Sequence, residues 1–231
     1  MSGIQLKNVS KYYEEGESKV IALDHVSLTV EPGEFVAIIG PSGSGKSTFL
    51  SIAGALLQAS EGEVILNGTK IAGQTQKELS RIRLKEIGFI LQTSNLVPYL
   101  TVLDQLLLVK KMSGKVKTAD RIFAQDLLKD LGLGKKLQKF PDQLSGGERQ
   151  RTAIARAFVN DPDIILADEP TASLDTHRAH EVVQLIAKEV KARNKAAIMV
   201  THDERMLTYC DRVYHMEDGK LSPVPHTPAH A

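Results

Sequence analysis

A glycine-rich segment early in the chain has the residue types that bind phosphate. The stretch Gly40-Pro-Ser-Gly-Ser-Gly-Lys46-Ser47 matches G-x-x-x-x-G-K-[ST] in full. Glycines let the backbone approach phosphate oxygens closely and point successive N–H groups toward them. In this pattern the lysine brings its charge to the β- and γ-phosphates, and the following hydroxyl binds magnesium. The predicted phosphate-binding residues are Gly40, Pro41, Ser42, Gly43, Ser44, Gly45, Lys46, Ser47 and Thr48.

Two adjacent carboxylates follow an apolar run much later in the chain. Asp168 and Glu169 come directly after the apolar residues 164–167. Magnesium prefers hard oxygen ligands and usually keeps several waters, so Asp168 is placed to hold it directly or through water. Glu169 is then the candidate to polarise the attacking water. An acidic strand end before a turn has little meaning alone, but together with the phosphate loop it completes one magnesium site.

Short apolar runs between turn signals predict the elements that position these residues. Strands are predicted at 34–39, 63–67, 87–91, 163–167 and 196–200, and helices at 46–57 and 176–192. The valines of the second helix lie on one face at helical spacing. The phosphate loop follows a predicted strand and precedes a predicted helix, the context that distinguishes it from a chance Gly/Ser-rich turn. This alternation predicts an α/β fold, with a mainly parallel sheet covered by helices.

The middle of the chain has a different pattern. From Thr101 to about Val159 it is helical, without a convincing strand, and Leu127, Leu128 and Leu131 form one apolar helix face. We therefore predict one domain over 1–231 with a helical insertion. Its core subdomain covers about 1–92 and 160–221, its helical subdomain about 93–159, and residues 222–231, which include three prolines, form a disordered tail.

Composition excludes several classes of protein. The 231 residues carry a formal net charge of +1, so no global field draws the chain to nucleic acid, and no nucleic-acid partner is expected. Cys210 is the one cysteine, which rules out an internal disulfide. No apolar run approaches the length of a membrane span. If the protein acts at a membrane, it must dock on another protein.

Leu144-Ser-Gly-Gly-Glu148, followed by Arg149-Gln-Arg151, resembles the signature motif of ABC ATPases. A glycine-containing helix cap would explain this segment alone, but not the other ABC elements that occur in order. Those are Tyr13, the phosphate loop, Gln92, the signature, Asp168-Glu169, Ser173-Leu174-Asp175 and His202. The resemblance covers 4–219. It implies a P-loop NTPase (RecA-like) core, an N-terminal antiparallel β part, an inserted α-helical subdomain, and hydrolysis of ATP with Mg²⁺.

The resemblance also implies a role for each matching residue. Tyr13, or Tyr12 one position earlier, is similar to the aromatic residue that stacks on adenine. Gln92 is similar to the glutamine that touches magnesium and senses the membrane partner, and His202 to the histidine that holds the γ-phosphate and the attacking water. The implied catalytic residues are Lys46, Gln92, Glu169 and His202, and the implied magnesium ligands are Ser47, Gln92 and Asp168.

In this family the signature of one subunit closes over the nucleotide of another. The resemblance therefore implies that Ser145, Gly146, Gly147 and Glu148 bind ATP across a subunit interface, with the following helix supplying its positive end. Asp175 is similar to the aspartate that contacts the opposite subunit. The chain has one phosphate loop and one signature, so two complete sites need two chains. The expected partner is a second copy, head to tail, with two ATPs between the subunits.

Within the family, the chain resembles the ATPases of macrolide-efflux and lipoprotein-release systems. More narrowly it resembles the ATPase subunit of bacterial haem-efflux transporters, on the segments 54–57, 94–100 and 170–175. The resemblance implies an integral-membrane permease as partner, a location on the cytoplasmic face of the cell membrane, and export, with haem as a candidate cargo. The alternatives are transmembrane signalling, cell-division regulation, or export of a lipoprotein, macrolide or peptide antibiotic.

The apolar segment 96–103 directly follows the region of Gln92. Its functional interpretation is a docking groove for a helix of the permease, with Tyr99 facing that partner. Its structural interpretation is packing inside the helical subdomain, which must account for most of these side chains.

A P-loop kinase or GTPase would have no use for the signature at 144–148, and the absence of a cysteine cluster argues against a zinc-containing repair ATPase.

Overall fold

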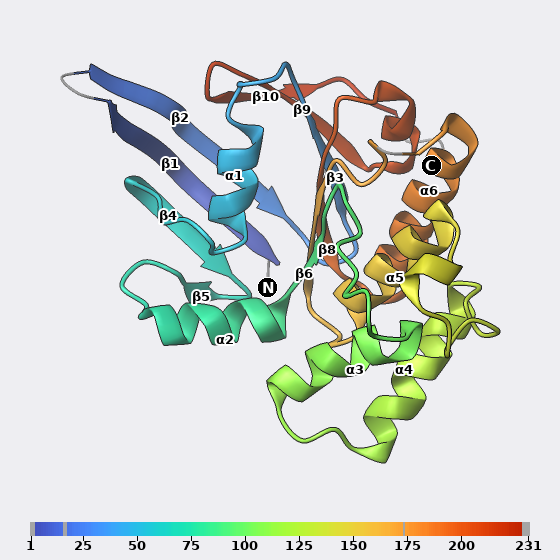
Figure 1. The fold of residues 1–231 in the computed structure, drawn as a ribbon. Helices are drawn as coiled ribbons and strands as arrows, with labels where there is room; N and C mark the ends of the chain where they lie inside the picture. The colour runs from blue at the N-terminus through green and yellow to red at the C-terminus, as the bar shows by residue number, and fades with distance from the viewer. Residues whose placement is uncertain (1–2, 16–17, 173, 228–231) are drawn as a thin grey trace.

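The computed structural model describes residues 3–15, 18–172 and 174–227 (Figure 1). Ser173, from the motif 173–175, and the end of the predicted tail, 228–231, lie outside the described residues. The strands are β1 Ile4–Glu15, β2 Ser18–Val30, β3 Phe35–Ile39, β4 Glu61–Leu66, β5 Thr69–Lys70, β6 Ile87–Ile90, β7 Ile164–Asp168, β8 Ala196–Val200, β9 Arg212–Glu217 and β10 Lys220–Val224. The helices are α1 Lys46–Ala53, α2 Gln76–Glu86, α3 Val102–Ser113, α4 Thr118–Asp130, α5 Gly146–Phe158 and α6 Thr176–Ala192. Short 3₁₀ turns occur at η1 Pro141–Gln143 and η2 Glu204–Tyr209.

A six-stranded sheet in the order β10-β9-β3-β8-β7-β6 forms the centre of the molecule. Every neighbouring pair is parallel except β10 with β9. The predicted mainly parallel sheet is therefore confirmed. Successive residues of a strand face opposite sides, so Phe35 and Ala37 pack into one core while Val36 and Ile38 pack into the other. A strand buried on both faces reads as a continuous apolar run, which is why these strands were visible in the sequence.

The second sheet is antiparallel, in the order β2-β1-β4-β5, as the resemblance implied. Its apolar face and helix α1 pack together against one side of the central sheet. The long hairpin β1–β2 extends away from this core, as Figure 1 shows at the upper left. Val20 and Ile21, near its outer end, line a cavity that the phosphate loop also lines.

Helices cover the other face of the central sheet. Buried residues of α3, α4, α5 and α6 form one apolar cluster with β3, β7 and β8. The predicted helical insertion between 101 and 159 is thus observed as α3, α4, η1 and α5, and Figure 1 places α3 and α4 at the lower edge of the molecule. Among the described residues, no helix combines the length and apolarity that crossing a membrane requires.

Two sequence predictions need correction. The helix expected to run to Leu57 ends at Ala53, because Ala55 takes a left-handed conformation with φ 53° and the Leu56 N–H donates back to the Ser51 oxygen at 2.8 Å. The tail expected from Ser222 begins inside a strand, since Ser222, Pro223 and Val224 continue β10 and pair with β9. Proline is tolerated here because β10 is an edge strand, where a missing N–H leaves no ladder bond unmade.

Candidate functional site

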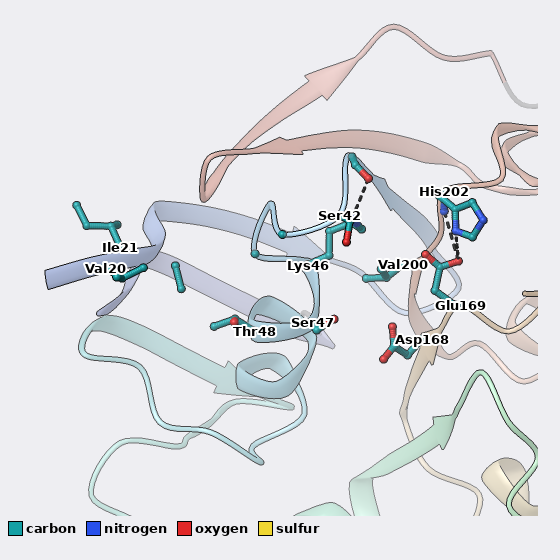
Figure 2. Close-up of a pocket in the computed structure, with 14 residues that line it drawn as sticks. Val20, Ile21, Ser42, Lys46, Ser47, Thr48, Asp168, Glu169, Val200 and His202 are labelled. Carbon is teal, nitrogen blue, oxygen red and sulfur yellow. Dashed lines mark hydrogen bonds and ion pairs between the residues drawn. The ribbon is translucent and has the colours of Figure 1, made fainter. Parts of the chain in front are cut away.

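The predicted phosphate loop, the two acids and His202 line one open cavity (Figure 2). The cavity measures about 440 Å³ and lies beyond the carboxyl ends of β3 and β7. Ligands of parallel α/β sheets bind in this position. The loop and the start of α1 contribute Gly40, Ser42, Gly43, Gly45, Lys46, Ser47 and Thr48 to its lining. Pro41 and Ser44 belong to the same loop but are not lining residues, and Ser44 is buried.

Two glycines allow the phosphate loop to turn back on itself. Gly40 has φ 149° and Gly45 has φ 104°, conformations that residues with a Cβ rarely adopt. A Cβ at Gly40 would lie 2.0 Å from the backbone oxygen of Met216, and one at Gly45 would lie 2.4 Å from that of Ala22. The loop therefore needs glycine at both positions. Helix α1 begins directly after it, so the positive end of the helix dipole faces the loop.

The Lys46 ammonium group is held inside this loop. Its Nζ donates hydrogen bonds to the backbone oxygens of Gly40, at 2.8 Å, and Pro41, at 2.7 Å. Lysine is a flexible cation with rotatable donors, so a phosphate could take the place of either carbonyl. The loop thus keeps a positive charge at the cavity wall.

Asp168 ends strand β7 and lines the same cavity. Burial raises the pKa of this carboxyl group above its usual value of 3.8, repulsion from Glu169 adds to that rise, and the Lys46 charge opposes it. A carboxylate destabilised in this way gains from a nearby cation, because the cation offsets the cost of keeping it charged away from water.

Glu169 and His202 lie side by side on one wall of the cavity, as Figure 2 shows. The Oε2 atom of Glu169 lies 2.9 Å from Nδ1 of His202 and also accepts a hydrogen bond from the His202 backbone N–H at 3.4 Å. The Glu169 side chain is 18% exposed, whereas that of His202 is 70% exposed. A half-buried carboxylate beside an imidazole can hold a water molecule and accept its proton, which is the arrangement that general-base hydrolysis needs.

The donor set of the cavity suits magnesium. Ser47 and Asp168 line the same cavity and offer a hydroxyl and a carboxylate, the oxygen ligands that Mg²⁺ takes while keeping several waters. The described residues hold no group of three or more His, Cys, Asp or Glu side chains arranged to bind a metal. The site therefore fits a cation held jointly by few protein ligands and a bound phosphate, and does not fit an all-protein metal cage.

Gln92 lies outside the lining of this cavity. It follows β6 by two residues, is exposed, and stands at the same edge of the sheet as Asp168, because Ile90 of β6 pairs with Ala167 of β7. The Gln92 predicted from the sequence is therefore at the same strand edge as the acids, without a hydrogen bond to either of them.

The two candidate tyrosines differ in their surroundings. Tyr12 donates its hydroxyl proton to Glu61 at 3.2 Å. Tyr13 is 43% exposed, pairs across the hairpin with Val20, and carries the Lys11 ammonium 5.4 Å from its ring centroid. Val20 lines the cavity. Tyr13 is thus the more exposed of the two tyrosines, and the residue paired with it belongs to the cavity lining.

The signature residues Leu144–Glu148 do not line the cavity of their own chain. Ser145 caps helix α5: its hydroxyl accepts from Glu148 N–H at 3.2 Å, and Glu148 accepts from Ser145 N–H at 2.8 Å. The Ser145 N–H donor lowers the pKa of Glu148, and Lys136 lowers it further. The Glu148 carboxylate thus binds the backbone of its own helix cap, and Gly146 and Gly147, which carry no side chains, form the first two residues of α5.

Asp175 caps the next helix in the same way, since its side chain accepts from the Arg178 N–H. It is exposed and does not line the cavity. The structure therefore brings together the phosphate loop, both acids and His202 within one chain, and leaves Gln92, Tyr13, the signature and Asp175 outside that cavity.

Sequence reasoning missed the apolar wall of the site. Val20, Ile21 and Ala22 of β2 and Val200 of β8 also line the cavity. The first two are about half exposed, which is unusual for adjacent branched apolar residues. The signal was present as an apolar pair next to the charged segment 14–19, but only the pairing with Tyr13 shows where it lies.

A glycine loop between a buried parallel strand and a helix, facing a strand that ends in two acids, defines a P-loop nucleotide-binding cassette. The profile of the family described as "ABC transporter" matches residues 23–172. The chain belongs to the ABC transporter family. It is the ATP-binding, ATP-hydrolysing subunit of such a transporter, and the predicted resemblance to ABC ATPases is confirmed.

Individual relatives agree with this assignment. The chain is 47% identical over 218 residues to the "Putative hemin import ATP-binding protein HrtA" of Staphylococcus haemolyticus (strain JCSC1435), covering 94% of this chain and 98% of that protein. It is 48% identical over 217 residues to the protein of that name from Staphylococcus aureus (strain N315), with the same coverage. Among solved structures, the dimeric post-hydrolysis state of the ATP-binding cassette MJ0796 bound to ADP and Pi is 40% identical, with TM-score 0.83, over 97% of this chain and 100% of that one.

Proposed function

We propose that this chain hydrolyses ATP with Glu169 as the general base and His202 as the group that positions Glu169 and the γ-phosphate. The single observation that carries the proposal is the 2.9 Å contact between Glu169 Oε2 and His202 Nδ1 in the wall of the phosphate-loop cavity. In the proposed reaction the water attacks the γ-phosphorus, its proton passes to the Glu169 carboxylate, and ADP leaves. Lys46 balances charge on the β- and γ-phosphates.

Ser47 and Asp168 are the proposed magnesium ligands, with Gln92 joining them when the site is filled. Bound there, the cation would neutralise negative charge on the phosphates of the nucleotide. The supporting observation is the raised pKa of Asp168, a carboxylate that a cation would relieve. Tyr13 is the proposed adenine-stacking residue, because its exposed ring lies across from Val20 at the outer end of the cavity.

A second copy of the chain completes the proposed site. Gly146 and Gly147 begin helix α5, where the first backbone N–H groups have no acceptor within the helix, and with the capping residue Ser145 they lie outside the cavity of their own chain. A helix start of this kind binds phosphate well, so we propose that it covers the γ-phosphate held by the other copy, with Glu148 fixing the cap and Asp175 contacting that copy. The similar MJ0796 cassettes are dimeric in their solved structures.

Glu169→Gln tests the base and the dimer together. The variant removes the base while leaving the phosphate loop and Asp168 intact. We expect it to bind ATP with wild-type affinity, to lose turnover by about 10²–10⁴-fold, and to sediment as an ATP-dependent dimer at micromolar concentration. Wild-type turnover would overturn the base assignment, and a monomer at every ATP concentration would overturn the dimer.

The proposed transport partner is an integral-membrane permease, which holds this ATPase at the cytoplasmic face of the membrane. Tyr99 supports this proposal, because it is 77% exposed in the segment between β6 and α3, close in sequence to Gln92. The proposed division into a core subdomain (about 1–92 and 160–221) and a helical subdomain (about 93–159) would let ATP binding move the two parts relative to each other.

We propose haem as the cargo and export as the direction. The cargo is supported by the names of the relatives from Staphylococcus, which mention hemin. The direction rests on the resemblance to efflux ATPases, whereas those names say import. Growth of a deletion strain in haem decides between them. Loss of an exporter should lower the tolerated haem concentration, loss of an importer should raise it, and an unchanged tolerance would overturn haem as the cargo.

A further inference from the structure

The segment after His202 is tied to the start of helix α6 by one arginine. Arg205 donates from Nε to Asp203 Oδ1 and from a terminal nitrogen to Asp203 Oδ2, each at 2.7 Å. Its other terminal nitrogen donates to the hydroxyl oxygen of Thr176, also at 2.7 Å. A guanidinium group presents its donors in a rigid plane, so it fixes the relative position of the two groups that it bridges.

Asp203 in turn fixes the backbone next to His202. Its N–H donates to the Thr201 hydroxyl at 3.0 Å, and Thr201 is fully buried and bonded through its own N–H to Ile38 of β3. The Asp203 Oδ1 atom also accepts a hydrogen bond from the Arg205 backbone N–H at 3.1 Å, and this bond caps the start of turn η2. His202 thus lies between a residue anchored in the central sheet and a residue held by Arg205.

His202 has little else to hold it. Its side chain is 70% exposed, and among the described residues its polar partner is Glu169. Its direction is therefore set by the backbone on either side. A small movement of Asp203 would change the contact between Nδ1 and Glu169 Oε2, which carries the proposed chemistry.

The other end of the bridge is next to the surface that a second copy is proposed to reach. Thr176 is the first residue of α6 and directly follows Asp175. A second contact supports the same pairing of elements, since His180 of α6 lies 3.1 Å from the Tyr209 hydroxyl at the end of η2, with the two rings edge to face. Helix α6 and turn η2 are therefore joined at both ends of η2.

We propose that Arg205 is a positioning residue that couples Asp175 to His202, so that contact of the second copy at Asp175 sets the place of the histidine against Glu169. This inference rests on the proposed function, because it needs a dimer that meets at Asp175. Arg205 touches neither the nucleotide cavity nor the reacting atoms, and acts through Asp203 and Thr176.

The bridge is exposed enough that its loss should leave the fold intact. The Arg205 side chain is 56% exposed, and exposed ion pairs contribute little to global stability. Substitution should therefore change the rate of hydrolysis without changing Tm. This separation distinguishes a positioning role from a structural one.

The experiment compares Arg205→Gln, Arg205→Lys and Thr176→Val with wild type. We expect Arg205→Gln to lower kcat roughly 5- to 10-fold, with KM for ATP and Tm unchanged. Arg205→Lys keeps the charge without the planar fork and should recover part of the rate. Thr176→Val should resemble Arg205→Gln, and the double variant should lose no more than either single one, because both break the same bridge. Lys129→Gln, which breaks an exposed ion pair to Asp126 in α4, is the matched control.

The dimer is measured separately. In the Glu169→Gln background, Arg205→Gln should leave ATP-dependent dimerisation unchanged. If the wild type neither hydrolyses ATP nor dimerises, the proposed function fails. If the wild type does both and Arg205→Gln retains its kcat, or loses kcat only together with Tm or dimer affinity, the coupling role of Arg205 is wrong while the proposed function stands.

Discussion

At the scale of single residues, Glu169 shows how the fold prepares a reactive group. Its φ of 46° is a left-handed conformation that costs a residue with a side chain on the order of 1–3 kcal/mol. The backbone holds it there, because the Glu169 N–H donates to Val200 of β8 at 2.9 Å. The strained turn directs the carboxylate to His202 and away from the strand. The sequence predicted the role of Glu169 as the base, but not its backbone conformation, which depends on the hydrogen bond to β8.

Asp168 gives a residue-scale prediction about pH. Burial raises its pKa in the folded state, so its protonated form favours folding. That stabilising contribution is complete below the unfolded pKa, near 3.8, and is lost as pH rises through the higher folded pKa. At pH 7 the charged group therefore opposes folding, and Asp168→Asn should raise Tm in the absence of nucleotide. Each 1 kcal/mol corresponds to about 2–4 °C in a chain of this size.

Thermal melts of Asp168→Asn and wild type between pH 3.5 and 7 make the measurement, at roughly half-unit steps. The difference in Tm should shrink as pH falls toward the unfolded pKa. Asp126→Asn removes an exposed carboxylate and should show no such pH-dependent gain. Equal melting of Asp168→Asn and wild type at pH 7 would contradict the role given to burial.

The phosphate loop and the acids were predictable because a few adjacent residues determine their chemistry. The adenine-stacking tyrosine was only partly predictable, because Tyr12 and Tyr13 are neighbours on one strand. What distinguishes them in the structure is the hydrogen bond from the Tyr12 hydroxyl to Glu61. That contact joins residues far apart in the sequence, which no local pattern contains. The Arg205 bridge to Thr176 was missed for the same reason.

At the scale of elements, one buried side chain organises the segment that displays Tyr99. Gln105 of α3 is 1% exposed. Its side chain accepts from the Val97 N–H at 3.1 Å and donates to the oxygens of Val97, at 2.7 Å, and Leu100, at 3.1 Å. A buried amide that satisfies three backbone groups of a loop replaces the hydrogen bonds that a strand or helix would give. The segment is thereby held in one shape without regular structure.

Gln105→Leu should release this segment. The change removes the partner of the Val97 N–H and of the Leu100 oxygen, both partly buried, at a cost of about 1–3 kcal/mol. We expect a lower midpoint in urea unfolding and weaker association with the permease, while ATP binding is retained because the cavity does not include this loop. Met112→Leu, at an exposed position of the same helix, is the control. Unchanged stability in Gln105→Leu would show that the loop does not depend on these bonds.

The regular elements followed from sequence wherever both faces of a strand are buried or a capped helix has one apolar face. The strand at 164–168 and the helix at 176–192 are examples. Boundaries failed where no local sequence signal marked them. Ala55, not a glycine, takes the left-handed conformation that ends α1 early, and pairing with β9 orders Ser222–Val224 despite a proline.

At the scale of the whole molecule, the groups of the proposed reaction are distributed between two surfaces. The cavity holds the phosphate loop, Asp168, Glu169 and His202, whereas the signature at 144–148 and Asp175 lie outside it. In the proposed mechanism one chain therefore contains both halves of a composite site, but on separate surfaces. The order of the motifs along the sequence does not show which of them share a surface. Their separation, which makes a second copy necessary in the proposed mechanism, is a property of the fold.

The remaining prediction concerns the surface that would join this ATPase to a permease. Tyr99 is 77% exposed, the largest exposed fraction among the large apolar side chains of the described residues. A tyrosine offers broad contact area at low entropic cost, so an exposed one is a strong candidate for an interface anchor. Tyr99→Glu would place a charge in that interface. Because Tyr99 lies outside the nucleotide cavity, the substitution should leave ATP binding unchanged.

Co-purification with the permease is the measurement for Tyr99→Glu, and ATP binding by the isolated chain is its internal reference. We expect the variant to lose the permease while binding ATP as wild type does, since an uncompensated charge in an apolar contact costs several kcal/mol. Ile122→Glu adds the same charge at an exposed apolar position of α4 and should keep the permease. If Tyr99→Glu co-purifies fully, docking must occur on another face. Loss of ATP binding together with the permease would instead mean that Tyr99 supports the fold rather than the interface.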